Sequence, residues 1–317
     1  MTNGAHIAPI IAGPVGQFLG WRWTFRMAAI FDAFMLITII FCLPETLYIR
    51  KETETPVPFS KKVYMHGLRL WIREPSLKLQ PRHFVIGPLK MAKYPSVVFP
   101  ALYYASAYGF ASILPAVTVT AIFTKFFHWD TLDIGLGYGA ALTIGSFLGE
   151  LAGGMVVDAV VRRETRRLGG RSPEPEVRLQ AIWTGEILVP IGLLIYGFCI
   201  EYHAPWIAPL IGMAIACFGL QVVTTTCYTY AIECYREEGS EVSLIFTFIR
   251  QEIGMTFAFY VVPMCTAIGY QWTFLFFTLC FGLLAFIPIL MLMFKGKQIR
   301  DYYGKPRGVN AFDTDRG

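Results

Sequence analysis

Four ionisable residues lie deep inside long apolar runs of the sequence: Asp32, Glu150, Arg250 and Glu252. A charge at the centre of a membrane costs roughly 2.5–3.5 kcal/mol on insertion scales, so such residues are expected to pair or to function. Glu150 and Arg250 each lie about eight residues from the same end of their runs, a depth of roughly 12 Å. Equal depth and opposite charge predict an ion pair between them, formed directly or through Glu252 or Glu233. Such a pair either holds two helices together permanently or rearranges when a gate opens.

Two carboxyl groups within apolar runs, Asp32 and Glu186, stand apart from this predicted pair. Asp32 is near the middle of its run and is a candidate proton site, because loss of water disfavours the charged form of a lone carboxyl group. A structural role for Asp32 is the alternative. Glu186 is closer to the end of its run, and we expect it to reach the aqueous interface or nearby arginines.

A second set of residues combines aromatic rings with hydroxyl, amide and carboxyl groups. Rings beside a carboxylate suit an amphipathic cation through cation–π contact and charge. Alternatively, the rings fill helix interfaces and the hydroxyls bond backbone carbonyls. The candidates for a substrate path are Tyr103, Tyr104, Tyr108, Gln221, Thr225, Tyr228, Gln251 and Glu252.

The composition indicates which elements must position these residues. Of 317 residues, 55% are hydrophobic and only 15% are charged, whereas soluble domains carry about 25% charged residues. This deficit argues against soluble and disordered proteins and predicts an all-α polytopic membrane protein with about eight transmembrane helices. The expected spans are 6–20, which is short and weak, 24–43, 97–124, 131–157, 180–200, 205–232, 242–268 and 272–294.

Basic residues predict the orientation of these spans. Of the 27 lysines and arginines, 23 fall on one side of the predicted membrane. That side should be cytoplasmic, because positively charged loops are retained there. The C-terminus is then cytoplasmic as well.

The sequence gives no sign of enzymatic, metal or cofactor chemistry. The seven cysteines include no CxxC pair and are better explained as small packing residues. None of the five histidines belongs to an HExxH pattern, and neither a G-x-S-x-G pattern nor a P-loop occurs. We therefore expect no catalytic residues, no metal, no cofactor and no nucleic-acid partner.

The spans are divided by a proline-rich, basic stretch. We expect residues 1–43 to hold two spans of an N-terminal bundle, 44–95 a cytoplasmic linker, 96–296 a six-span C-terminal bundle, and 297–317 a cytoplasmic tail. Transporters are often built from two similar halves. Two spans before the linker and six after it predict a twelve-span architecture that lacks about its first four spans.

Several motifs carry a family resemblance. Gly13, Pro14 and Gly16, followed by Trp21–Trp23, resemble the antiporter motif of drug:proton antiporters in the major facilitator superfamily. Small residues at such spacing let helices approach closely, and Pro14 bends the helix. Ordinary helix packing is the alternative explanation. Further resemblance to fungal members comes from Pro44–Thr46, Gly149–Gly154 with Asp158, Arg162 and Arg163, Pro175–Leu179 and Tyr230–Tyr235.

The resemblance implies a secondary transporter that works by alternating access. It implies that the antiporter motif seals two bundles together, and that a charged cluster holds one state of the gate. The gating or ion-pair candidates are Glu150, Asp158, Arg162, Arg163, Glu233 and Arg250. The implied partners are the lipid bilayer, a small drug-like or polyamine-like solute and protons, in a fungal plasma membrane. A non-transporting truncated remnant and a sugar or nutrient porter of the same fold remain alternatives.

Overall fold

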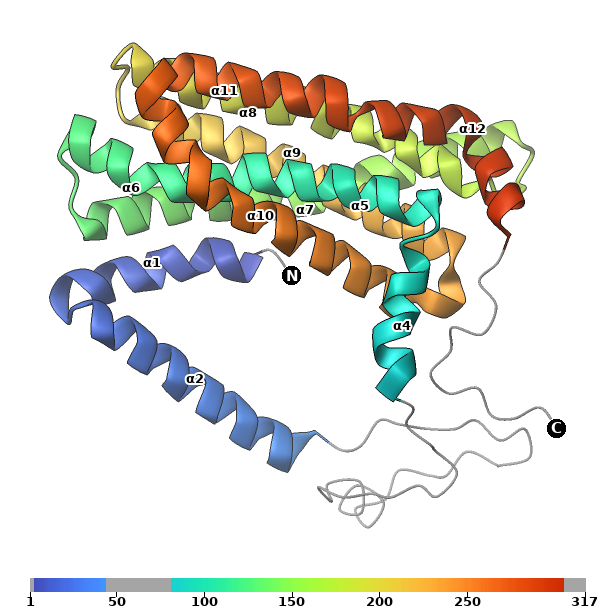
Figure 1. The fold of residues 1–317 in the computed structure, drawn as a ribbon, viewed down its shortest axis with the longest axis horizontal. Coiled ribbons are helices and arrows are strands. Elements are labelled where there is room, and N and C mark those ends of the chain that lie inside the picture. The colour runs from blue at the N-terminus through green and yellow to red at the C-terminus, as the bar shows by residue number, and fades with distance from the viewer. Residues whose placement is uncertain (1–2, 44–80, 305–317) are drawn as a thin grey trace. The chain divides into compact units, whose positions relative to one another are not determined.

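The computed structural model describes residues 3–43 and 81–304, and every regular element in these ranges is a helix (Figure 1). Residues 44–80 of the predicted linker lie outside the described residues. The elements are α1 Asn3–Phe18, α2 Trp21–Cys42, α4 Pro81–Met91, α5 Pro95–Tyr108, η1 Gly109–Ile113, α6 Leu114–Phe127, α7 Thr131–Arg167, η2 Pro175–Ala181, α8 Ile182–Glu201, α9 Ile207–Cys234, η3 Arg236–Glu238, α10 Gly239–Ile268, α11 Tyr270–Leu279, η4 Cys280–Ala285 and α12 Ile287–Tyr303.

The apolar runs become long helices, as the composition predicts. Among the described residues, six helices are long and apolar enough to cross a membrane, or seven if the two parts of α10, bent by 42°, count as one span. The first predicted span falls in α1, whose 16 residues reach about 24 Å and are short of a hydrocarbon core of about 30 Å. The bend in α10 lies close to Pro263, which cannot donate to the carbonyl four residues earlier.

The chain divides into two compact units, and the boundary falls inside α1 after Pro14. The predicted boundary at residue 43 is therefore not where the units divide. The first unit joins the beginning of α1 to the chain from Gln80 onward, and we call its helices α4 to α12 the C-terminal bundle. The second unit contains α2, which buries none of its side chains and exposes Asp32.

Glycines let α9 pack closely against α7 and α8 (Figure 1). A Cβ atom at Gly149 of α7 would lie 2.6 Å from the backbone oxygen of Phe218. A Cβ atom at Gly192 of α8 would meet the backbone of Gly212 and Ala216 in the same way. Small residues of this kind bring helix backbones together in membranes, where helix association depends on close packing.

Two π-helical segments interrupt the spans just before prolines. Segment η1 joins α5 to α6, and the amide of Leu114 donates to the carbonyl of Gly109, five residues earlier. Pro115 follows and cannot donate to its own helix. Segment η4 likewise leads into α12 before Pro288. The wider turns accommodate the missing donors without ending the helices.

Candidate functional site

A pocket of about 730 Å³ lies in the C-terminal bundle, and α5, α7, α9 and α10 contribute its lining. This volume is in the usual range for small-molecule sites, about 300–1,000 Å³. The lining residues are Tyr104, Glu150, Gln221, Thr224, Thr225, Tyr228, Thr229, Ile232, Ser240, Ser243, Leu244 and Thr247.

Helical periodicity explains why these side chains share one cavity. On α9 the lining positions 221, 225, 228 and 232 recur every three or four residues, and on α10 the adjacent positions 243 and 244 lie between 240 and 247 at the same spacing, so each set occupies one helix face. The ring of Tyr104 meets the ring of Tyr228 edge-on at 5.3 Å between centroids. The pocket is therefore walled by two aromatic rings, small hydroxyl groups and a single carboxyl group, Glu150.

Four of the eight predicted path residues line this pocket: Tyr104, Gln221, Thr225 and Tyr228. The other four are Tyr103, Tyr108, Gln251 and Glu252, and none of them is among the lining residues. Tyr103 is fully buried elsewhere in the bundle, whereas Gln251 and Glu252 are exposed on α10.

The prediction missed the hydroxyl residues of α10. Ser240, Ser243 and Thr247 recur at helical spacing just before Arg250. This spacing is the signal that could have identified them.

The predicted ion pair between Glu150 and Arg250 does not form in the described part of the chain. Glu150 accepts a hydrogen bond from the Asn3 amide at 2.6 Å. The guanidinium carbon of Arg250 lies 4.5 Å from the ring centroid of Tyr108, in cation–π geometry. The reason is lateral placement, because α7 packs on α9 whereas α10 packs mainly on α5. Equal depth along two helices does not make their side chains face each other.

The beginning of α1 packs against the C-terminal bundle through Asn3, His6 and Gly13. Gln221 donates to the Asn3 side-chain oxygen at 3.3 Å. His6 is 1% exposed, and its Nε2 lies 3.2 Å from the Ser112 hydroxyl. A Cβ atom at Gly13 would lie 3.0 Å from the Cα of Gly135 on α7. The resemblance to the antiporter motif therefore coincides with a tight helix contact.

His6 is a residue that sequence reasoning passed over. It lies at the edge of the weakest predicted span, and α1 has Pro9 and Pro14 inside it. Besides the Ser112 hydroxyl, the sulfur of Cys217 lies 3.7 Å from its Nδ1. The spacing of Asn3, His6 and Gly13 along one helix face was the available signal.

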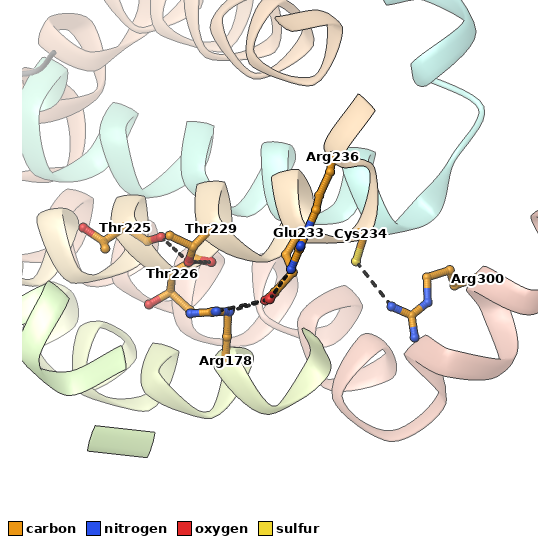
Figure 2. Close-up of polar contacts among 8 residues, drawn as sticks. All are labelled: Arg178, Thr225, Thr226, Thr229, Glu233, Cys234, Arg236 and Arg300. Carbon is orange, nitrogen blue, oxygen red and sulfur yellow. Dashed lines mark hydrogen bonds and ion pairs between the residues drawn. The ribbon is translucent and has the colours of Figure 1, made fainter. Parts of the chain in front are cut away.

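A charged cluster, shown in part in Figure 2, lies where η2, α9 and α12 meet. Arg178 binds Glu233 through two hydrogen bonds, one of them from Nη2 to Oε1 at 3.2 Å. Arg236 adds a second contact to Glu233 at 3.3 Å. Glu233, predicted as a gating residue, is therefore ion-paired, and its main partner is an arginine 55 residues away in sequence.

Glu174 forms the second part of this cluster. It accepts hydrogen bonds from Lys297 at 2.7 Å and from Arg300 at 2.9 Å. These two cations hold the pKa of the Glu174 carboxyl below its usual value. Arg300 also lies 3.6 Å from Glu176. Helix α12 ends at Tyr303, so it includes the first residues of the predicted tail, 297–317.

The other predicted gating residues, Asp158, Arg162 and Arg163, are exposed at the end of α7. The Nε of Arg162 donates to the backbone oxygen of Asp158 at 3.2 Å, within one helix turn. Among the described residues, no group of three or more His, Cys, Asp or Glu side chains could hold a metal ion.

Comparison with known families matches residues 1–259 to the Major Facilitator Superfamily. The chain belongs to this superfamily. The predicted all-α major facilitator fold and the recognised resemblance are therefore confirmed. This chain is a transporter-family protein, and its polytopic helices fit a multi-pass membrane location.

Several curated relatives of this major facilitator chain come from fungi. It is 26% identical to Efflux pump radE of Floropilus chiversii over 94% of the chain and 55% of that relative. It is 28% identical to Efflux pump FUBT of Fusarium oxysporum, over 94% of the chain and 50% of that relative. A Saccharomyces cerevisiae protein named "Probable drug/proton antiporter YHK8" is 26% identical over 94% of the chain and 58% of that relative.

The chain thus spans about half the length of the curated relatives it matches. No solved structure matches it.

Proposed function

We propose that this protein acts in secondary active transport, moving a small drug-like or polyamine-like solute by alternating access in exchange for protons. The pocket of about 730 Å³ in the C-terminal bundle is the observation that carries the proposal. Its two tyrosines and Glu150 offer ring faces and a negative charge, which suit an amphipathic cation. Relatives named as an efflux pump and as a probable drug/proton antiporter support the same proposal.

We further propose a plasma-membrane location with the C-terminus in the cytoplasm. The strongly basic side of the chain carries the charged cluster of Arg178, Glu233, Glu174 and Arg300. Ion pairs between carboxylates and arginines there suit a contact that forms in one conformation of the alternating-access cycle and breaks in the other. Asp158, Arg162 and Arg163 remain our candidates for the same gate, and Asp32 for a proton site in the second unit.

A transport assay on the 317-residue chain reconstituted in lipid vesicles tests the proposal. The probes are radiolabelled spermidine, the cationic dye rhodamine 6G and glucose, each with and without an imposed pH gradient. We expect gradient-driven movement of spermidine or the dye that a protonophore abolishes. Movement of glucose alone would support the nutrient porter instead, and movement of none of the probes would support the non-transporting alternative.

Two adjacent threonines provide a matched pair of variants. Thr225 lines the pocket, whereas Thr226 is fully buried and donates to the Val222 carbonyl at 2.8 Å. Thr225→Val should raise the KM for the transported probe several-fold, because a lining hydroxyl is lost. Thr226→Val should leave the KM near its original value, and equal effects of the two variants would argue against this pocket.

A further inference from the structure

A second carboxyl group, Glu186 of α8, is buried in the C-terminal bundle and does not line the pocket. Its side chain accepts a hydrogen bond from the Tyr103 hydroxyl at 2.6 Å. Glu186 is 9% exposed and Tyr103 is 0% exposed. The expectation that Glu186 reaches the interface or nearby arginines is therefore wrong, because the side chain turns inward toward α5.

The surroundings of Glu186 supply a hydrogen bond but no positive charge. A Cβ atom at Gly282 of η4 would lie 3.3 Å from Oε1, so that oxygen faces the backbone of the π-helical segment. The ring of Phe281 stacks on Tyr103 at 5.1 Å between centroids. Tyr103 of α5 is the titratable group that contacts Glu186, and the buried thiol of Cys227 on α9 interacts in turn with Tyr103. Among the described residues, no Lys, Arg or His forms an ion pair with Glu186.

An uncompensated carboxylate in such a place is costly. Burying an ionised group without a countercharge requires far more free energy than burying the neutral acid, which a single hydrogen-bond partner can satisfy. A membrane protein retains such a group where taking up and releasing a proton has a use. We propose that Glu186 is a proton-binding site of this protein, separate from the pocket, and that Tyr103 senses its protonation. The coupling part of this inference rests on the proposed proton-driven transport.

The protonation step exchanges one O–H bond for another. A hydronium ion transfers its proton to a Glu186 carboxyl oxygen, so an O–H bond of hydronium breaks, an O–H bond of the acid forms and water is left; Tyr103 keeps its own hydrogen and continues to donate. The hydrogen bond from Tyr103 to Glu186 weakens on protonation, because an ionised acceptor makes a shorter and stronger hydrogen bond than a neutral one. Release of the proton restores the stronger bond.

Helix α5 connects this site to the pocket. Tyr103 and Tyr104 are consecutive, and successive side chains on a helix diverge by about 100°. Tyr103 therefore points to Glu186 while Tyr104 lines the pocket against Tyr228. The π-helical segment η1 follows α5 directly, and such segments mark places where a helix can readjust. A change in the Tyr103 bond would thus move Tyr104, which lets proton and solute influence each other's binding reciprocally.

Infrared titration of the purified 317-residue chain in lipid vesicles tests proton binding without any transport. We expect a carboxyl C=O band that grows as the pH falls, disappears in Glu186→Gln and changes frequency in Tyr103→Phe. Glu252→Gln, which alters an exposed carboxyl group on α10, should leave that band unchanged. A band that persists unaltered in Glu186→Gln would overturn the proposal. If that variant does not fold, an unaltered band in Tyr103→Phe would do the same.

Probe movement then tests the coupling separately. With Glu186→Gln we expect downhill movement of the probe to persist while its dependence on the pH gradient is lost. Retention of full gradient dependence would overturn the coupling role of Glu186 and leave proton-driven transport itself intact. A chain that moves no probe would contradict the proposed transport, yet the infrared band would still report whether Glu186 binds a proton.

Discussion

Arg178 of η2 and Glu233 of α9 form a two-point ion pair that ties two distant segments of the chain together. Their side chains are 23% and 22% exposed, so the pair is largely shielded from water. Planar guanidinium and carboxylate groups that meet through two hydrogen bonds gain both strength and fixed orientation. This pair fixes the end of α9 against the segment that leads into α8.

Removing either partner of this pair should destabilise the protein. Arg178→Gln and Glu233→Gln should each lower the free energy of unfolding by about 1–3 kcal/mol, since a partly buried charge loses its partner. The double variant should lose less free energy of unfolding than the sum of the two single losses, and the difference, the coupling energy, should be about 1 kcal/mol. Unfolding in detergent micelles measures all three.

Arg236→Gln is the control for that cycle. Arg236 also contacts Glu233, but its side chain is 76% exposed and lies three residues away on the same segment. Exposed pairs of this kind contribute about 0.2–1 kcal/mol, so the effect should be smaller than that of Arg178→Gln. Additive effects of Arg178→Gln and Glu233→Gln would contradict the ion pair.

A methyl group at Gly135 should separate α1 from α7. The added Cβ would lie 2.7 Å from both the Gly13 Cα and the Pro9 oxygen, which are backbone atoms that cannot turn aside. Gly135→Ala should therefore lower the free energy of unfolding by about 1–3 kcal/mol. It should also increase labelling of Cys217, whose sulfur lies against His6, by a membrane-permeant maleimide, as followed by mass spectrometry.

Gly154→Ala is the matched control on the same helix, because nothing lies within 4 Å of its added Cβ. It should leave Cys217 protected and should be neutral or slightly stabilising, since alanine favours helix more than glycine does. Equal labelling of Cys217 in the two alanine variants would contradict the α1 contact.

The Glu174 cluster should respond to acid. Lys297 first, and then Arg300, hold the pKa of Glu174 below its usual value of 4.5. A carboxyl group with a lowered pKa in the folded state stabilises that state above pH 4.5, and the stabilisation is lost as the pH falls through the lowered value. Glu174→Gln should therefore reduce the melting temperature at neutral pH and make no difference in strong acid.

That effect should be small and sensitive to salt. The Glu174 side chain is 50% exposed, and exposed ion pairs contribute little in water. At about 1 M salt, where the Debye length is about 3 Å, the difference between the variant and the original chain should vanish. A difference that survives both strong acid and high salt would show that Glu174 acts through packing instead.

Half of the residues that the sequence predicts as a substrate path line one pocket, because a helix fixes which residues share a face. Tyr104, Thr225 and Tyr228 lie in apolar runs at positions that helical periodicity brings together, and the pocket contains all three. Tyr103 shows where this reasoning ends. It is adjacent to Tyr104 in sequence, yet it faces Glu186, because the neighbouring helix decides what each face contacts.

Partners across helices could not be predicted for the same reason. Glu150 and Arg250 lie at equal depth with opposite charge, yet Glu150 binds Asn3 and Arg250 covers Tyr108. Depth follows from counting residues along one helix, whereas contact depends on which helices pack together and how each is rotated. Close approaches such as Gly149 against Phe218 fix those rotations.

The sequence alone determined that this protein is all-helical, that its helices suit a membrane and that it belongs with major facilitator proteins. These properties are local, because they follow from composition, run length and short motifs. Only the tertiary structure decided that Glu186 is buried against Tyr103 and that Arg178 pairs with Glu233. The physical reason is that both contacts join residues more than 50 positions apart, and helix packing selects them.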